Sequence, residues 1–494
     1  MKYRIFPSIG IARVGDSDKF FLGPEWPGGL GAEIAADGSE ADVTSFKDPD
    51  FRVKRQGARF HVFEFEDDGS GPGRPARLPA GARIKWTVHL ANKKAAIQRP
   101  PAPPNPAAFA FPIATPFPNR ILDGLAREIF GANAGPVKFT PAPDPQEPRP
   151  DYLGELRTDG NQRLIVLGGR GKSVGDELRL THFYRNATWY DDVSDGSVNA
   201  EIVFADGTPP QKAEPAWVIV APPDFAPTIQ GVVTLYDVLF EVAVQNFGFT
   251  IPAEPSFTEH IYPIVKRAIE LKWVHDSPIW SDFSTDFAAL SQSSCDSPPP
   301  ALRTNTIKLL QRIQGNTNVL DRFALLRFQN DLLKRWDEGK VKCDWQGVPP
   351  IDRAITPKGL TRAALEASVG AGLHPGIEAG SLVTRKEIYT SPFDFRFSHA
   401  VLNPGDVTAF MAQPWQADFW DCRLQWWPSQ RPDIIRASTT PGDVTQWAGG
   451  VSNHKDMVHN ATKLGVLWPK TNAQGQTVGM REEGRSPSMP HLPN

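Results

Sequence analysis

The hydrophobic pattern of the chain changes near residue 250, and this change constrains the fold more than any other feature. Before it, short runs of β-forming residues stand between Gly, Pro and Asp residues, which predicts strands. After it, apolar residues recur at helical spacing. The expected fold class is therefore α+β, with a β-rich, sandwich-like domain at residues 1–250 and a helix-and-loop-rich region at residues 251–494.

Individual elements follow from the same patterns. The predicted strands lie within residues 59–65, 84–90, 163–169 and 216–223. Three helices are expected: one after the N-cap candidate Ser256, one over roughly 318–338 with Phe323, Leu326, Leu333 and Trp336 on one stripe, and one over 360–369 after Pro357.

Charge and hydropathy exclude several classes of function. Lys and Arg number 53 against 56 Asp and Glu, a net charge of −3, and no basic patch is present, so no nucleic-acid partner is expected. No apolar run approaches the roughly 20 residues that span a bilayer, so no membrane insertion is expected. The N-terminal residues lack the apolar stretch of a Sec signal peptide. A cytoplasmic location is the default expectation, with export by a non-Sec route left open.

Metal and phosphate sites also find little support. The three cysteines are an odd number without a CxxC pair, which argues against a disulfide framework and against zinc. The histidines form no HxxxH or HExxH pattern, so no metal is expected. The acidic run at residues 191–196 lacks EF-hand spacing, and Asp and Ser that turn or cap the backbone explain it equally well. Residues 168–173 lack the spacing of a phosphate loop and predict a tight turn.

Residues 414–428 carry the most unusual chemistry. Asp418 precedes Cys422 by four positions, and the indoles of Trp426 and Trp427 follow closely. This combination suits a redox cofactor built from the chain itself, by joining the cysteine sulfur to an oxidised indole. The same residues also fit an aromatic core with a free thiol and a turn-capping Asp418. A hydrolase pair of Cys422 with His399 or His374 is disfavoured, because apolar surroundings blunt a thiol's nucleophilicity.

Several long motifs, in order along most of the chain, resemble the LodA-like family of quinoprotein amino acid oxidases, which includes lysine ε-oxidase and glycine oxidase. The similar segments are residues 5–15, 21–25, 55–60, 153–159, 189–196, 374–378, 414–422 and 427–432. The family carries cysteine tryptophylquinone. The resemblance implies that the C-terminal region holds this site.

Carried over by residue, the resemblance gives Cys422 the role of the cofactor cysteine and Asp418 a role in maturation and catalysis. Trp427 or its neighbour Trp426 is the expected indole partner, with Trp447 and Trp468 left open. His374 is similar to an active-site position of the glycine oxidase branch. Arg431 is expected to form a structural salt bridge with Asp433 or Asp421 rather than to bind substrate.

The implied reaction is oxidative deamination of a primary amine of an amino acid, glycine-like or lysine-like, through a Schiff base on the quinone. Oxygen is the acceptor, ammonia and hydrogen peroxide are released, and Asp418 is the expected base. The resemblance also implies a flavoprotein maturation partner, and a homo-oligomeric state is left open. Three alternatives remain: a quinone-free family member that acts as a binding or scaffold protein, a quinoprotein that acts as a dehydrogenase, and a quinoprotein that acts on a peptide-bound amine.

Overall fold

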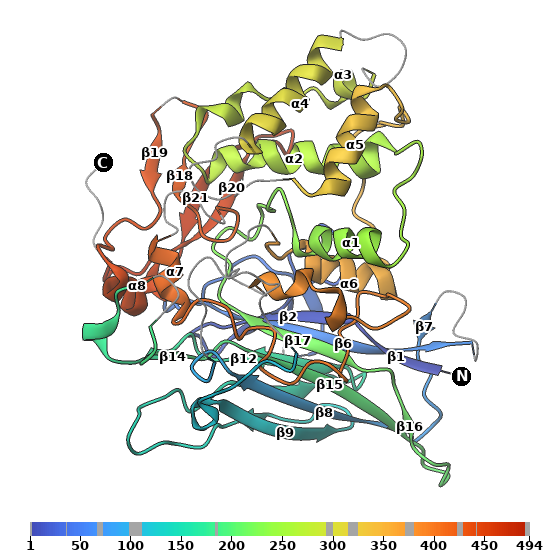
Figure 1. The fold of residues 1–494 in the computed structure, drawn as a ribbon, viewed down its shortest axis with the longest axis vertical. Coiled ribbons are helices and arrows are strands. Elements are labelled where there is room, and N and C mark those ends of the chain that lie inside the picture. Colours follow the sequence, from blue (N-terminus) through green and yellow to red (C-terminus); the bar gives the residue numbers. More distant parts are fainter. Residues whose placement is uncertain are drawn as a thin grey trace.

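The computed structural model describes residues 2–35, 37–66, 73–97, 111–182, 186–292, 300–314, 325–370, 380–421, 428–440 and 442–489. Within these residues, one sheet of 15 strands dominates the first part of the chain, and helices dominate the part that follows (Figure 1). The α+β fold class is thereby confirmed. The boundary at residue 250 stays a prediction.

The main path of the sheet runs β10-β11-β12-β6-β2-β17-β15-β8-β9. Its strands are β2 (Ile9–Arg13), β6 (Arg55–Phe65), β8 (Arg83–Asn92), β9 (Leu122–Phe130), β10 (Val137–Phe139), β11 (Gly154–Thr158), β12 (Leu164–Gly168), β15 (Ser194–Val203) and β17 (Ala216–Ala221). Further strands pair beside this path: β1 (Lys2–Phe6), β3 (Phe20–Leu22), β4 (Ala32–Ile34), β5 (Glu40–Asp42), β7 (Arg74–Pro75) and β16 (Gln211–Lys212). All four predicted strands are confirmed.

The alternation in the sequence explains how these strands bury one face. In β8, Ile84, Trp86, Val88 and Leu90 are buried, while the residues between them are partly exposed. The sheet also curls until its two end strands meet: a Cβ built on Gly124 of β9 would lie 2.9 Å from the Cβ of Phe139 in β10. Glycine at this position therefore permits the close approach of the two ends.

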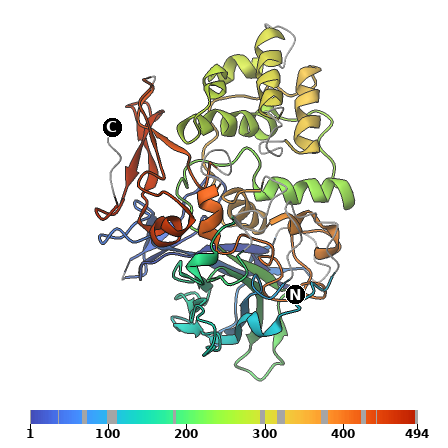
Figure 2. The same ribbon diagram turned by 60° about the vertical axis from the view of Figure 1, so that its left-hand side comes forward.

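Two layers of helices cover the sheet on one side (Figures 1 and 2). Helices α1 (Leu235–Asn246) and α6 (Pro357–Glu366) pack on β2 and β17 through a buried apolar cluster. Helices α2 (Tyr262–Glu270), α3 (Phe287–Gln292), α4 (Pro300–Gln314) and α5 (Arg327–Asp337) lie farther from the sheet. Among the described residues, no helix has the length and apolar character needed to cross a bilayer.

Two predicted helix boundaries were wrong for local reasons. The helix expected from about residue 318 begins at Arg327, because Leu326 is extended and its N–H is bound by the Gln329 side chain at 3.0 Å. Residues 318–324 of this predicted helix, Phe323 among them, lie outside the described residues. The helix expected at 360–369 spans Pro357–Glu366, because Thr356 caps its N-terminus. The Ser256 cap is confirmed: its hydroxyl accepts from Glu259 N at 2.9 Å, just before α2.

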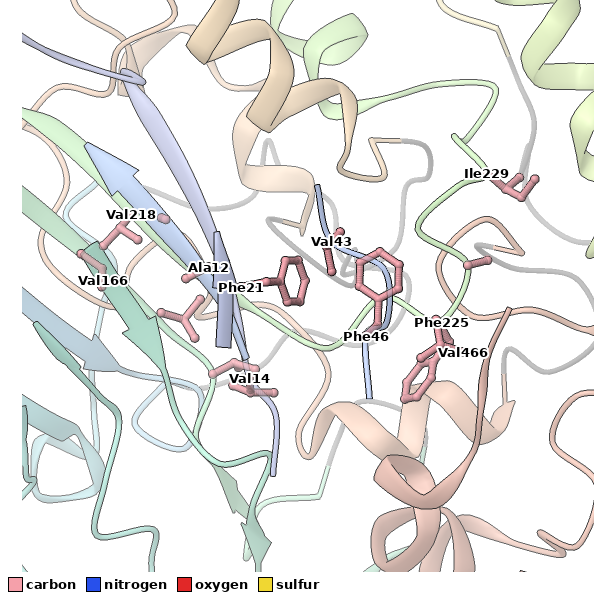
Figure 3. Close-up of a cluster of buried hydrophobic side chains, with 14 of the residues drawn as sticks. Ala12, Val14, Phe21, Val43, Phe46, Val166, Val218, Phe225, Ile229 and Val466 are labelled. Atoms are coloured by element: carbon pink, nitrogen blue, oxygen red, sulfur yellow. The ribbon is translucent and has the colours of Figure 1, made fainter. Parts of the chain in front are cut away.

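The remaining C-terminal elements return to the sheet. They are α7 (Trp415–Asp421), α8 (His454–Asn460), the short strands β18 (Ile434–Arg436) and β19 (Val444–Gln446), and the hairpin of β20 (Val466–Thr471) and β21 (Thr477–Glu483). Figure 3 shows the apolar cluster that joins the two parts, with Val466 of β20 and Phe225 on one side and Phe46 on the other. Because this core is shared, the C-terminal region is anchored directly on the N-terminal sheet.

Candidate active site

Helix α7 carries Asp418, the base expected from the sequence. Pro414 precedes it, and the carbonyl of Pro414 accepts from Ala417 N at 3.1 Å, which closes the first turn. Asp418 lies in the middle of α7 and is only 2% exposed. The rings of Trp415 and Phe419 lie 4.8 Å apart on either side of it in sequence, and both are buried. The candidate base is thus shielded from water, one helical turn after the buried Trp415.

The predicted tight turn at residues 168–173 supports α7 from the side of the sheet. Ser173 Oγ donates to Gln416 Oε1 at 2.7 Å, and Gln416 Nε2 donates to the carbonyl of Gly171 at 3.2 Å. These contacts connect a turn of the N-terminal sheet with the first turn of α7. The segment therefore has a structural role next to the candidate site.

The acidic run beside this turn lies mostly in strands, with Asp192 in a bend between them. Asp191 belongs to β14 (Tyr190–Asp191), which pairs with β13 (Ser173–Val174), and Asp195 belongs to β15. Asp195 is fully buried and accepts from the N–H and hydroxyl of Thr408 at 2.8 and 2.6 Å and from Trp217 Nε1 at 3.0 Å. Burial raises its pKa to about 6. No group of side chains suited to hold a metal ion occurs among the described residues.

Asp192, between these two aspartates, is also buried. Its Oδ2 accepts from Lys172 N at 3.1 Å, while its Oδ1 has no hydrogen-bond partner within the described part of the chain. Burial, with a smaller contribution from the neighbouring charge of Asp191, raises the pKa of its carboxyl to about 7. The run thus holds three buried carboxylates, and that of Asp191 contacts the first amide of α7.

Arg431 has the structural role expected from the sequence. It is fully buried; its Nε donates to the carbonyl of Phe419 in α7 at 2.6 Å, and its Nη1 lies 3.3 Å from Asp433 Oδ1. Its guanidinium also lies 5.3 Å from the ring centroid of Trp447. Arg431 therefore fastens the end of α7 to the following chain. The alternative partner Asp421 pairs with His454 instead, at 3.0 Å.

The two tryptophans left open as cofactor partners occupy different places. Trp447 is fully buried, its Nε1 donates to the carbonyl of Gly465 at 2.8 Å, and its ring lies 4.9 Å from Phe225, which also contacts Phe419 of α7. Trp468 lies in β20 against Phe46, at 5.5 Å between ring centroids. Trp447 is therefore linked to α7 through one phenylalanine, whereas Trp468 faces the N-terminal part.

The remaining expected site residues, Cys422, Trp426, Trp427 and His374, lie outside the described residues. The residues that flank the cysteine segment still test whether a group made there fits. Trp415 Nε1 before it and Gln430 Oε1 after it are buried and, as far as the structure is described, have no hydrogen-bond partner. The Trp415 N–H would donate to a ring oxygen of a quinone, and the Gln430 oxygen would accept from the N–H of its indole. The flanking residues therefore fit the expected cofactor.

His399, the other histidine considered beside Cys422, belongs to the scaffold. Its Nε2 lies 3.1 Å from the carbonyl oxygen of Ala216, and its ring lies 5.1 Å from that of Trp217. Burial lowers its pKa to about 4, so the ring is neutral at pH 7. This arrangement favours a structural role for His399.

The support of α7 was not foreseen from the sequence. Lys94 and Asp191, which bind its first turn, are 97 residues apart, and Asp191 is 224 residues from Trp415. No local sequence pattern predicts contacts between residues so far apart. The sequence offered one indication: residues 189–196 and 414–422 both belong to the motifs that resemble the LodA-like family.

Comparison with known proteins identifies the family. A model described as L-lysine epsilon oxidase N-terminal matches residues 6–220, and one described as L-lysine epsilon oxidase C-terminal domain matches residues 310–447. L-lysine 6-oxidase of Marinomonas mediterranea is 28% identical over 550 aligned positions, which cover 89% of this chain and 74% of that protein.

Solved structures give the same fold. The epsilon-lysine oxidase of Marinomonas mediterranea superposes with a TM-score of 0.78 at 23% identity, over 98% of this chain and 95% of that chain. A crystal structure of the Schiff base intermediate of that enzyme with L-Lys gives the same values. Together the two family models span most of the sequence, and the chain belongs to the L-lysine epsilon oxidase (LodA-like) family.

Proposed function

We infer that this chain is an amino acid oxidase that removes a primary amine of its substrate with oxygen as the electron acceptor. Its family membership and its likeness to L-lysine 6-oxidase along 89% of the chain support this class of reaction. A primary amine, oxygen and water give a carbonyl product, ammonia and hydrogen peroxide. A glycine-like and a lysine-like substrate both agree with the family.

The cofactor we propose is cysteine tryptophylquinone, made from Cys422 and an indole, with Trp427 or Trp426 as the expected partner. The quinone supplies an electrophilic carbonyl, which no ordinary side chain offers. The buried polar atoms of Trp415 and Gln430 on both sides of the segment support a polar group at this place. A flavoprotein maturation partner is part of the proposal, because the ring oxygens must be installed on the indole.

The structure contains a disulfide that bears on this proposal. Cys343 is disulfide-bonded, although the odd number of cysteines had argued against a disulfide framework. The thioether needs the sulfur of Cys422, so the proposed function requires that Cys343 pairs with Cys295. Described neighbours favour this pairing: the ring of Phe287 in α3, which ends at Gln292, lies 5.6 Å from that of Trp345.

The observation that carries the proposal is the burial of Asp418 within α7, four residues before Cys422. We assign this carboxylate the removal of the proton from the carbon that bears the amine. The aromatic rings of Trp415 and Phe419 limit the access of water, so the proton passes to the carboxylate and not to solvent. His374 is proposed to orient the substrate. Arg431 is bound to Phe419 and Asp433 and holds the helix in place.

The test compares two aspartates of the same helix. Asp418→Asn should lower peroxide release per mole of quinone at least about 100-fold, the usual contribution of a general base. Asp421→Asn is the matched control, because the Asp421 side chain is 38% exposed and pairs with His454 at the surface. We expect its rate to stay within about threefold of wild type, because surface ion pairs contribute little.

Peroxide release is measured over a panel of amino acids, with protein co-expressed with a maturation flavoprotein. A wild-type rate in Asp418→Asn would refute the role of Asp418. A wild-type protein with no quinone stain and no peroxide release from any substrate would favour the binding or scaffold alternative. Activity confined to peptide-bound amines would favour the alternative of a quinoprotein that acts on such amines.

A further inference from the structure

We propose that the buried Lys94–Asp191 ion pair is a positioning device that sets the register of α7, and with it Asp418, for formation of the quinone and for catalysis. The inference rests on the proposed function and extends it to two residues of the N-terminal part of the chain. Lys94 is the second residue after β8, and Asp191 is the last residue of β14, which pairs with β13 in a separate two-stranded sheet. Lys94 contacts the chain just before α7, and Asp191 contacts the first amide of α7.

The ion pair binds the chain on both sides of the Gln413–Pro414 peptide. Lys94 Nζ lies 2.5 Å from Asp191 Oδ2 and donates to the carbonyl of Ala412 at 2.6 Å. The same Oδ2 accepts from Trp415 N, the first N–H of α7, at 2.9 Å. Lys94 therefore fixes the carbonyl of Ala412, and Asp191 fixes the first amide of α7.

Asp191 is itself held in a single orientation. Asn92 Nδ2 donates to the carbonyl of Asp191 at 2.9 Å, to its Oδ1 at 3.1 Å and to the carbonyl of Val193 at 2.8 Å. Asn92, Lys94 and Asp191 are at most 3% exposed. Because water is excluded, loss of either charge leaves the other buried without its counter-ion, which is costly.

A shift at Trp415 is transmitted to Asp418, because the two residues are one helical turn apart. Asp418 must lie within hydrogen-bond reach of the atom whose proton it takes, and misplacement by about 1 Å costs about 100-fold in rate. The Gln413 side chain binds the carbonyl of Trp189, and its own carbonyl accepts from Asn186 at 2.9 Å, so neighbouring contacts hold the overall fold. The ion pair therefore governs the precise placement of the helix rather than its existence.

The neighbouring ion pair provides a matched control. Lys93 Nζ lies 2.7 Å from Asp406 Oδ1, and the Lys93 and Asp406 side chains are 12% and 1% exposed. Like the contact of Lys94 with Ala412, this pair joins the chain after β8 to the chain before α7. In the described part of the chain, no hydrogen bond or ion pair joins it to the first turn of α7. Lys93→Met and Lys94→Met thus remove the same charge at neighbouring positions, and only the second releases α7.

Both variants and Lys94→Arg are prepared as full chains with the maturation flavoprotein. We expect Lys94→Met to lower the quinone content per folded protein at least about tenfold, Lys93→Met to keep it within about twofold, and Lys94→Arg to restore part of it. Hydrogen exchange of the peptide covering residues 410–421 is the second readout. We expect at least about tenfold faster exchange at Trp415 N in Lys94→Met only.

Full quinone content and unchanged exchange in Lys94→Met would overturn the inference. Equal losses in the Lys93 and Lys94 variants would also overturn it, because they would show a general loss of stability. If wild-type protein forms no quinone, the proposed function fails, and hydrogen exchange alone then decides whether the ion pair holds α7.

Discussion

Replacing Asp192 by asparagine should stabilise the protein, and increasingly so as the pH rises. The Asp192 carboxyl is 1% exposed, and its pKa is raised from 3.8 to about 7, chiefly because burial disfavours its charged form. A raised pKa means that the carboxyl keeps its proton to a higher pH in the native state than in the unfolded state. The stability of the wild-type protein therefore falls as the pH rises from about 4 to about 7.

The size of the pKa shift of Asp192 sets the size of its effect on the free energy of unfolding. Raising the pKa from 3.8 to about 7 corresponds to about 4 kcal/mol at about 1.36 kcal/mol per unit, and this cost is almost fully present at pH 8. At pH 5 about 2 kcal/mol of it is present, because the unfolded chain has released the proton and the native carboxyl has not. Asparagine keeps the shape and an acceptor for Lys172 N, and it carries no charge to bury.

The assay is urea unfolding of the wild type and Asp192→Asn at pH 5 and pH 8, with the free energies compared at equal m-values. The advantage of the variant should grow by about 2 kcal/mol between the two pH values. Asp206→Asn is the control: hydrogen bonds from Thr208 lower the pKa of this exposed carboxyl, so its replacement should not stabilise the protein at pH 8. A variant that is destabilised equally at both pH values would refute the reasoning.

Two further predictions concern the sheet. Trp217→Ala should lower the free energy of unfolding by about 3–5 kcal/mol, because it empties a fully buried site and removes the Nε1 donor of Asp195. The control is Leu178→Ala, at a side chain that is 91% exposed. It should change the free energy of unfolding by less than about 0.5 kcal/mol in the same urea titration. Gly196→Ala should prevent soluble expression at 37 °C, because the new Cβ would lie 1.6 Å from the carbonyl oxygen of His89 in the paired strand β8. Gly160→Ala, whose Cβ would come no closer than 3.8 Å to Asn133, should express normally.

The sequence predicted the elements whose pattern is local. Alternation in residues 84–90 identified β8, and the serine at 256 identified a helix start. Helix α1 was missed, although Thr234 and Asp237 form a capping box at its start and its buried residues Leu235, Val238, Leu239 and Val242 recur at helical spacing. The start of α5 was misplaced, because the amide of Leu326 binds the Gln329 side chain instead of continuing the helix.

At the candidate site, too, the local sequence pattern predicted only some of the contacts. The short spacing of Asp418 and Cys422 and the pairing of Arg431 with Asp433 were accessible from the sequence, and the salt bridge of Arg431 is confirmed. The ion pair under α7 was not accessible, because Lys94, Asp191 and Trp415 meet only after the sheet has formed. The roles of Cys422, Trp426, Trp427 and His374 stay predictions.

Peptide masses of the purified protein directly test the proposal that the mature chain carries its own oxidant. We expect Cys422 to elute joined to a peptide containing Trp426, Trp427, Trp447 or Trp468, with two oxygens added to the indole, and Cys343 to elute joined to Cys295. Recovery of Cys422 as a free thiol or in a disulfide with Cys343, with every tryptophan unmodified after co-expression with the maturation flavoprotein, would contradict it.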